Sequence, residues 1–168
     1  MKKILIIVGL LIVASAVALF YFTDTFEKKE AANIQDEVNE YPNMNLIMTD
    51  GSFRTARELP ERSILILYFP DCDHCQRQAV EIESHLKAFE NYHLWFISIA
   101  PYEDIEKFAK GYKLTGHANI HFVRTEMQDV INNFGTISAP SIYVFSKERK
   151  LVKAFNGETK IEEIVSHL

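Results

Sequence analysis

The sequence predicts an α/β domain in which a central mixed sheet is flanked by helices on both faces, preceded by an apolar N-terminal segment. Two continuous apolar runs, residues 64–69 and 94–100, are typical of strands buried on both faces. Segments with helical spacing follow each of these runs, as in a β-α-β-α order. A final pair of strands joined by a short polar turn adds an antiparallel edge, which makes the predicted sheet mixed.

Length, charge and cysteine content exclude several classes of protein. The chain has 168 residues, with 18 basic against 23 acidic side chains and a formal net charge of -5. This acidic balance argues against a nucleic-acid partner, because neutralising phosphates requires an excess of Lys and Arg. The only cysteines are Cys72 and Cys75, which are too few for a disulfide framework or a four-thiolate zinc site.

Residues 1–22 are expected to be a membrane anchor or a signal segment. Lys2 and Lys3 precede an uncharged apolar run, residues 4–22, which as a helix spans roughly 28 Å, close to the thickness of a bilayer core. The positive-inside rule keeps the N-terminus in the cytoplasm, so the chain contacts the membrane through residues 4–22 and its domain lies outside.

The alternative is a cleaved signal peptide. Residues 14–16 (Ala-Ser-Ala) have the small-x-small form that a signal peptidase accepts, although apolar residues continue to Phe22. The anchored form is a single-pass protein of a bacterial cell membrane whose domain faces the periplasm or the exterior, and the cleaved form is secreted. Both place the domain outside the cytoplasm.

Residues 23–41 are predicted to be a charged linker, and residues 42–168 the folded domain. The linker is rich in Glu, Lys, Asn and Gln and poor in large apolar side chains. Once residues 1–22 are set aside, 16 basic residues face 23 acidic ones, a formal charge of -7. The exported part is therefore expected to be soluble.

The expected strands follow from apolar runs bounded by turn residues. Asp50-Gly51 is the turn of a first hairpin, Pro70 and Pro101 end the two buried runs, and a polar turn over residues 146–150 joins the last pair. The predicted strands are residues 45–48, 52–54, 64–69, 94–100, 120–123, 141–145 and 151–155.

The expected helices follow from apolar residues spaced by three or four positions. The first carries a stripe from Cys75 through Ala79 and Ile82 to Leu86 and Phe89. The others are residues 103–112, residues 127–134 (ended by Gly135) and residues 160–168.

The four residues Cys72-Asp73-His74-Cys75 lie where the first buried strand meets the first helix. A thiol at a helix N-terminus faces unpaired N–H groups and the positive end of the helix dipole, both of which favour the nucleophilic thiolate. Cys72 is therefore expected to attack, and Cys75, on the apolar stripe, to resolve the mixed disulfide.

A purely stabilising disulfide explains this spacing poorly, because closing so short a loop removes only roughly 2 kcal/mol of unfolded-state entropy. Half of a metal site is the other alternative, but the sequence has no second cysteine pair and no finger-like histidine spacing. No metal and no organic cofactor is expected.

The charged residues around the cysteines have opposite effects on the stability of the Cys72 thiolate. A protonated His74 would stabilise it, whereas Asp71 and Asp73 oppose it by like charge. Asp73 and His74 are therefore the residues expected to tune the reactivity of Cys72. His74 is equally compatible with a solvated position and no such role.

Pro140 precedes the predicted strand 141–145, a place where proline is disfavoured unless it is the first strand residue. A cis Ala139–Pro140 bond would leave a free backbone edge for an extended substrate, and an ordinary trans proline is the alternative.

Residues 45–168 resemble the thioredoxin-like superfamily, most closely the TlpA-type membrane-anchored or secreted thiol-disulfide oxidoreductases. The resemblance rests on ILILYFPDCDHC, HLWFISIA and FGTISAPSIYVF. It implies a thioredoxin-like fold, a redox-active disulfide between Cys72 and Cys75, and a cis-proline at Pro140. It also implies that backbone groups of Ala139 contact the substrate.

The sequence departs from that family at three points. Asp71 replaces the tryptophan before the first cysteine, Asp73-His74 replaces Gly-Pro, and the preceding strand has no buried acid to accept the proton of Cys75. Glu81 is a weak substitute for that acid. A peroxidase would need a Thr-x-x-Cys context, which the chain lacks.

The expected function is disulfide exchange with protein thiols and disulfides outside the cytoplasm, as a reductase rather than a strong oxidant, with regeneration by an unidentified redox partner. The alternatives are a copper-binding or copper-delivery protein that uses Cys72, Cys75 and a distant histidine such as His121, and a redox-inactive interaction domain.

Overall fold

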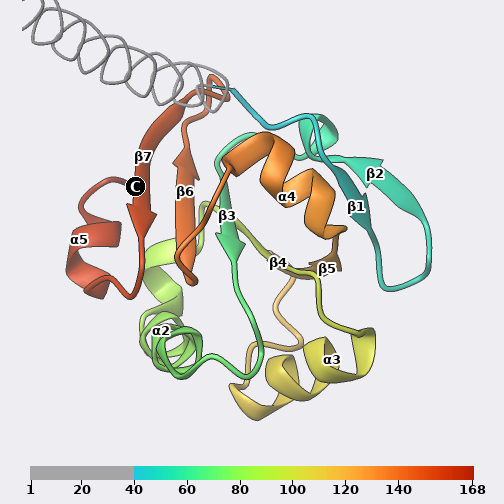
Figure 1. Ribbon diagram of the computed structural model, residues 1–168. Coiled ribbons are helices and arrows are strands. Elements are labelled where there is room, and N and C mark those ends of the chain that lie inside the picture. The colour runs from blue at the N-terminus through green and yellow to red at the C-terminus, as the bar shows by residue number, and fades with distance from the viewer. Residues whose placement is uncertain (1–39) are drawn as a thin grey trace, which may run out of the picture. The chain divides into compact units, whose positions relative to one another are not determined.

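A computed structural model describes residues 40–168, so the predicted anchor or signal segment and the predicted linker up to residue 39 lie outside the described residues (Figure 1). Within residues 40–168, no helix is both long enough and apolar enough to cross a membrane.

The sheet has seven strands in the order β2-β1-β5-β4-β3-β6-β7. The central strands β3, β4 and β5 run parallel to one another, whereas β1, β2, β6 and β7 pair antiparallel with their neighbours. The predicted mixed sheet is therefore confirmed. The strands are β1 (Asn45–Ile47), β2 (Phe53–Thr55), β3 (Ser63–Leu67), β4 (His93–Ser98), β5 (Ile120–Arg124), β6 (Ser141–Phe145) and β7 (Leu151–Asn156).

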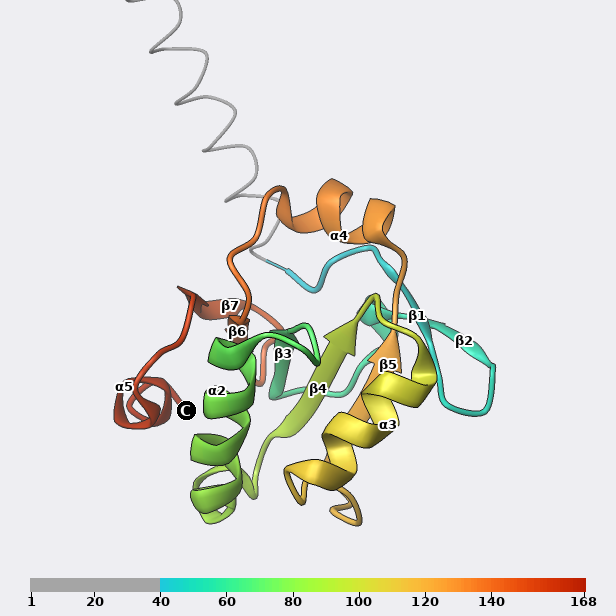
Figure 2. The same ribbon diagram turned by 60° about the horizontal axis from the view of Figure 1, so that its bottom comes forward.

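Helices cover both faces of this sheet, as predicted (Figure 2). Alternate residues of the central strands point to opposite faces, which divides the core in two. Ile64 and Ile66 pack with the side of α2, α3 and α5, while Leu65 and Leu67 pack with the side of α4. The helices are α2 (Asp73–Ser84), α3 (Tyr102–Gly111), α4 (Met127–Phe134) and α5 (Ile161–Val165).

Several element ends differ from the prediction. The first helix ends at Ser84, and Leu86–Phe89 forms a separate 3-10 turn, η2, that still buries Phe89. A second 3-10 turn, η1 (Ala56–Glu58), was not expected. The first buried strand ends at Leu67, although the N–H of Tyr68 still donates to the carbonyl oxygen of Ile97 at 3.1 Å, and Pro70, which has no N–H, cannot extend this pairing. The last helix covers only Ile161–Val165 of the expected nine residues.

Gly135 ends α4 as predicted, with a φ of 67° that glycine adopts without strain. This turn directs the chain from α4 into the segment that reaches β6. It therefore positions Ala139 and Pro140.

Tyr41, the last residue of the predicted linker, is buried against the domain, with 3% of its surface exposed. Its hydroxyl donates to the carbonyl oxygen of Pro60 at 2.6 Å and accepts from the N–H of Ser63 at 3.3 Å. The guanidinium of Arg149 lies 4.4 Å from the centre of its ring. These contacts make Tyr41 part of the folded unit.

Candidate functional site

Cys72 occupies the N-cap of α2, where β3 has ended and the chain turns at Pro70 and Asp71. The turn is closed by the N–H of Cys72, which donates to the carbonyl oxygen of Phe69 at 3.1 Å. The sulfur of Cys72 is partly exposed and accepts a hydrogen bond from the N–H of Cys75 at 3.4 Å. This is the N-cap role that a Ser or Asp oxygen usually plays, so the helix N-terminus favours negative charge on that sulfur.

Cys75 lies one turn into α2 and is 2% exposed, on the helix face that also buries Ala79 and Ile82. Burial raises the pKa of its thiol to about 12, and the hydrogen bond with Cys72 acts in the same direction. The two thiols therefore differ in access: an incoming sulfur can reach Cys72, while Cys75 is covered.

The raised pKa of Cys75 predicts an alkaline loss of stability in the reduced protein. The folded-state pKa of about 12 exceeds the ordinary value of 9.0. The free energy of unfolding is therefore unaffected by this thiol below pH 9 and decreases as the pH rises from 9 toward 12, where the thiol ionises only in the unfolded chain. At pH 10 we expect the loss to be about 1 kcal/mol, since each unit of pKa difference is worth about 1.4 kcal/mol. Urea unfolding of reduced wild type and of Cys75→Ala at pH 7.5 and pH 10 measures it. Equal losses in the two proteins would contradict the assignment to Cys75.

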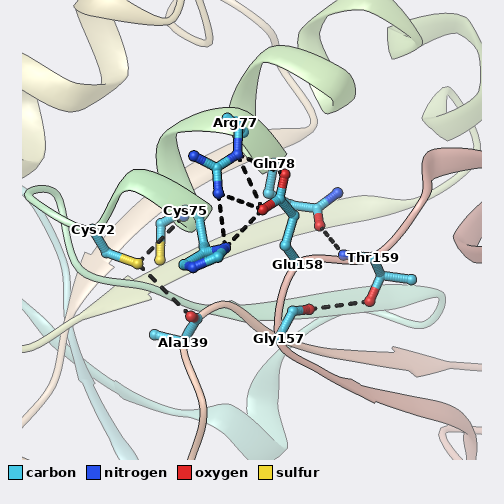
Figure 3. Close-up of polar contacts among 9 residues, drawn as sticks. Cys72, Cys75, Arg77, Gln78, Ala139, Gly157, Glu158 and Thr159 are labelled. Atoms are coloured by element: carbon cyan, nitrogen blue, oxygen red, sulfur yellow. Dashed lines mark hydrogen bonds and ion pairs between the residues drawn. The ribbon is translucent and has the colours of Figure 1, made fainter.

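Ala139 and Pro140 lie beside the cysteines, on the segment that joins α4 to β6. The peptide bond between them is cis. The thiol of Cys72 donates to the carbonyl oxygen of Ala139, with 3.7 Å between the two atoms (Figure 3). The structure thus brings together four of the residues named from the sequence, Cys72, Cys75, Ala139 and Pro140, from two segments that are far apart in the chain.

His74 is directed toward Glu158, at the start of the segment between β7 and α5. Its Nδ1 lies 2.7 Å from Oε2 of Glu158 and 2.8 Å from Nη2 of Arg77. Only one of these contacts is a hydrogen bond at a time, because Nδ1 either donates to the carboxylate or accepts from the guanidinium. The side chain of His74 is 63% exposed. Asp73 is exposed at the first position of the helix.

Arg77 and Glu158 form an ion pair with several hydrogen bonds at this end of α2, and sequence reasoning missed both residues. Arg77 donates from Nε and Nη2 to the carboxylate of Glu158, at 2.7 to 3.1 Å (Figure 3). Arg77 and then His74 lower the pKa of Glu158 to about 2. The two partners are separated by 81 positions, so no local pattern could have paired them.

Gln78 makes a second link between α2 and the same segment. It is 1% exposed, and its Oε1 accepts from the N–H of Thr159 at 2.8 Å. Among the described residues, its Nε2 and the hydroxyl of Tyr68 are buried without a hydrogen-bond partner. Burial raises the pKa of Tyr68, and the nearby Cys75 adds to that effect. Tyr68 therefore carries an unpartnered hydroxyl in the same core cluster as Cys75, and among residues 40–168 no hydrogen bond joins a carboxylate to the thiol of Cys75.

Glu158→Gln is expected to make the cysteine pair more oxidising. Arg77 lies in the first turns of α2 and is paired with Glu158, so removing the carboxylate leaves a positive charge uncompensated near the helix N-terminus that Cys72 caps. A more stable thiolate stabilises the reduced form, so we expect the reduction potential to rise by about 10–30 mV in low salt.

Equilibration with glutathione buffers measures this potential, and Glu163→Gln on α5 is the matched control. The shift should shrink in high salt, because the groups are exposed. A shift of opposite sign would show that Glu158 does not act through Arg77.

The structure does not assemble the alternative copper ligands. His121 stacks on Trp95 with ring centres 4.1 Å apart, on the face of the sheet that carries α4. Cys75 lies in the core on the opposite face. Within residues 40–168 there is no group of three or more His, Cys, Asp or Glu side chains that could hold a metal ion.

Glu81, the weak substitute for a buried acid, is exposed on α2. It lines a surface hollow with Glu158 and Ala139, and no contact joins it to Cys75 among the described residues. Glu81 therefore does not supply a carboxylate beside Cys75.

No protein-family model matches the chain, and no curated protein matches its sequence. Solved structures do match. A secreted Mycobacterium tuberculosis disulfide oxidoreductase homologous to E. coli DsbE is 13% identical, with a TM-score of 0.62 over 74% of this chain and 93% of that one. A thioredoxin-like protein from Aeropyrum pernix is also 13% identical, with a TM-score of 0.61 over 87% and 99%. Arabidopsis thaliana ScoI with copper bound is 15% identical, with a TM-score of 0.59 over 77% and 97%. At these identities the likeness shows a shared fold.

Proposed function

We propose that this chain, which has the thioredoxin-like fold, is a thiol-disulfide oxidoreductase that exchanges disulfides with proteins through Cys72 and Cys75. One observation carries the proposal: an accessible sulfur caps a helix N-terminus, and a second, covered thiol lies one turn behind it. An accessible thiolate and a protected resolving thiol are what two-step disulfide exchange requires.

In the first step, the thiolate of Cys72 attacks one sulfur of a client disulfide. A Cys72–client disulfide forms, the client disulfide breaks, and the leaving client sulfur departs with the bonding electron pair as a thiolate, which then takes up a proton. The carbonyl of Ala139 beside Cys72 offers a backbone acceptor to an extended client at this point.

In the second step, Cys75 loses its proton to water or to the leaving client thiolate and attacks the sulfur of Cys72. The Cys72–Cys75 disulfide forms and the second client sulfur is released. The client has then gained two electrons, which a dithiol protein must return to the Cys72–Cys75 disulfide. The raised pKa of Cys75 keeps its thiol protonated near neutral pH, which slows this second step.

The site of action is proposed to lie outside the cytoplasm, with the chain tethered by its apolar N-terminal segment or released by cleavage. The support is the charge order of residues 1–22, in which two lysines precede an uncharged run. Fractionation of cells that produce the full chain tests this location. Recovery from the soluble cytoplasm would refute it.

The direction is proposed to be client reduction. Asp71 and Asp73 flank Cys72 and oppose its thiolate, which stabilises the disulfide form and makes the dithiol the better reductant. Alkylation of thiols in intact cells reports the direction. A pair that is mostly reduced at steady state supports a reductase, and a mostly oxidised pair would show an oxidase.

Trapping tests the function itself. In Cys75→Ala, the first step still occurs but the mixed disulfide cannot be resolved, so client proteins should accumulate on Cys72 and dissociate on treatment with a reducing agent. Cys72→Ala is the matched control and should trap nothing. If both variants trap the same proteins or none, Cys72 is not the attacking residue.

A further inference from the structure

Two surface hollows flank the segment that carries Ala139. The first, of about 710 Å³, includes Ser138 and Ala139 at its edge and extends over the start of α5. The second, of about 330 Å³, includes Gly135, Thr136 and Ile137 from the same segment. A polypeptide bound across Cys72 and Ala139 would therefore reach one hollow on each side of its reactive cysteine.

The first hollow is acidic. Its charged lining consists of Glu81, Glu158 and Glu162 against Lys160 and, when protonated, His74. Glu158 is paired with Arg77 and His74, whereas neither Glu81 nor Glu162 has an ion-pair partner among residues 40–168. Lys160 has no ion-pair partner among these residues either, so the unpaired charges of the hollow are two carboxylates against one ammonium, a balance that favours a cationic side chain.

The second hollow is apolar, and no acidic, basic or histidine side chain lines it. Its floor comes from the ends of β3 and β4, where Leu67 and Ile97 are buried. Its rim includes Met127 and Ile131, which are 47% and 50% exposed and lie one turn apart on α4. Exposed apolar side chains gathered around a concave surface mark a binding site for apolar groups.

Two segments of the chain connect the apolar hollow to the cysteine site. Phe69 lines it, and the carbonyl of Phe69 accepts from the N–H of Cys72. Ile137 lines it as well, two residues before Ala139, whose carbonyl contacts the sulfur of Cys72. The chemistry on the two sides of Cys72 is therefore different, which allows a client to be selected by its flanking residues.

Given the function proposed above, we infer that the preferred client is an extended polypeptide with a basic side chain on one side of its reactive cysteine and a large apolar side chain on the other. The basic side chain lies against Glu81 and Glu162, and the apolar one enters the hollow between α4 and the ends of β3 and β4. Disulfide exchange follows the two steps described above, and the side chains that flank the client cysteine affect only the affinity for the client.

Short peptides, each with one cysteine in a mixed disulfide with a coloured aromatic thiol, test this inference on the reduced full chain. One peptide carries Lys and Leu on the two sides of the cysteine, a second Glu and Leu, and a third Lys and Ser, each made in both orders. We expect the Glu peptide to react about threefold more slowly than the Lys–Leu peptide, and the Ser peptide about tenfold more slowly.

Variants assign these preferences to the two hollows. Glu162→Lys should reverse the preference for Lys over Glu, while Glu163→Lys, the neighbouring acid that does not line the hollow, should leave it intact. Ile131→Asn should remove the preference for Leu over Ser. Its matched control is Val152→Asn on β7, which is 45% exposed and outside the hollow.

The outcomes distinguish this inference from the function on which it depends. If hydroxyethyl disulfide and every peptide are left unreduced, the proposed function fails. If all the peptides are reduced at equal rates, the function stands and the client preference is overturned. If the chain dimerises in sedimentation and Ile131→Asn abolishes the dimer, a second copy covers the apolar hollow and that half of the inference is overturned.

Discussion

Cys72→Ser should lower the rate constant for disulfide exchange by at least about a thousandfold, because a hydroxyl at neutral pH is neither ionised nor able to form a disulfide. Cys72 is the accessible sulfur at the N-cap of α2, and Cys75 is 2% exposed behind it. In Cys75→Ser the first attack should persist, with one coloured thiol released per chain and no further turnover. Single-turnover release from a mixed disulfide, followed by absorbance, measures both variants.

Serine is the matched replacement for both cysteines, since it is close in size and can accept the N-cap hydrogen bond that Cys72 accepts from Cys75. Circular dichroism of the two variants controls for folding. The assignment of roles would be reversed by a Cys72→Ser variant that keeps the single-turnover release and a Cys75→Ser variant that loses it.

Phe96→Ala should lower the free energy of unfolding by about 3–5 kcal/mol, a large part of the 5–15 kcal/mol that is usual for a domain. Phe96 is 1% exposed, in the core that also contains Cys75. Its ring stacks on Phe122 with centres 4.8 Å apart and meets the edge of Tyr68 at 5.7 Å. Truncation leaves a cavity that these rigid aromatic neighbours cannot fill.

Phe53→Ala is the control for this loss, because Phe53 is 72% exposed on β2. It should change the stability by less than about 0.5 kcal/mol. Urea unfolding of both variants at pH 7 measures the difference. Equal and small losses would mean that the core beneath Cys75 is far less tightly packed than the structure shows.

The different roles proposed for the two thiols follow from a few local features of α2. The N-cap position supplies Cys72 with a favourable helix end and partial exposure, while the apolar stripe of α2 covers Cys75 and raises its pKa. His74 and Arg77 contact Glu158 at the surface, so salt weakens the electrostatic effect of these groups on the cysteine pair. We therefore expect the environment of Cys75 to set the rate of the second step, and Glu158 to adjust the redox equilibrium.

The local sequence pattern was sufficient to predict the strand, turn and helix around the cysteines. An apolar run before Pro70 and a stripe with helical spacing after it depend only on neighbouring residues, so β3, α2 and the position of Cys72 between them were predictable. The end of α2 at Ser84 was not predictable, because the apolar residues continue through Leu86 to Phe89 in η2 without a break in their helical spacing.

Hydrophobic spacing and turn residues act over a few positions, so the mixed sheet, the order of its elements and the pair of thiols at a helix start could be predicted from the amino-acid pattern. The distant groups that meet those thiols could be identified only from the folded domain. It placed Ala139 against Cys72, paired Glu158 with Arg77 and His74 across more than 80 positions, and put His121 on the opposite face of the sheet. Such contacts depend on how strands align and helices pack across the whole domain, and no local run of residues records that arrangement.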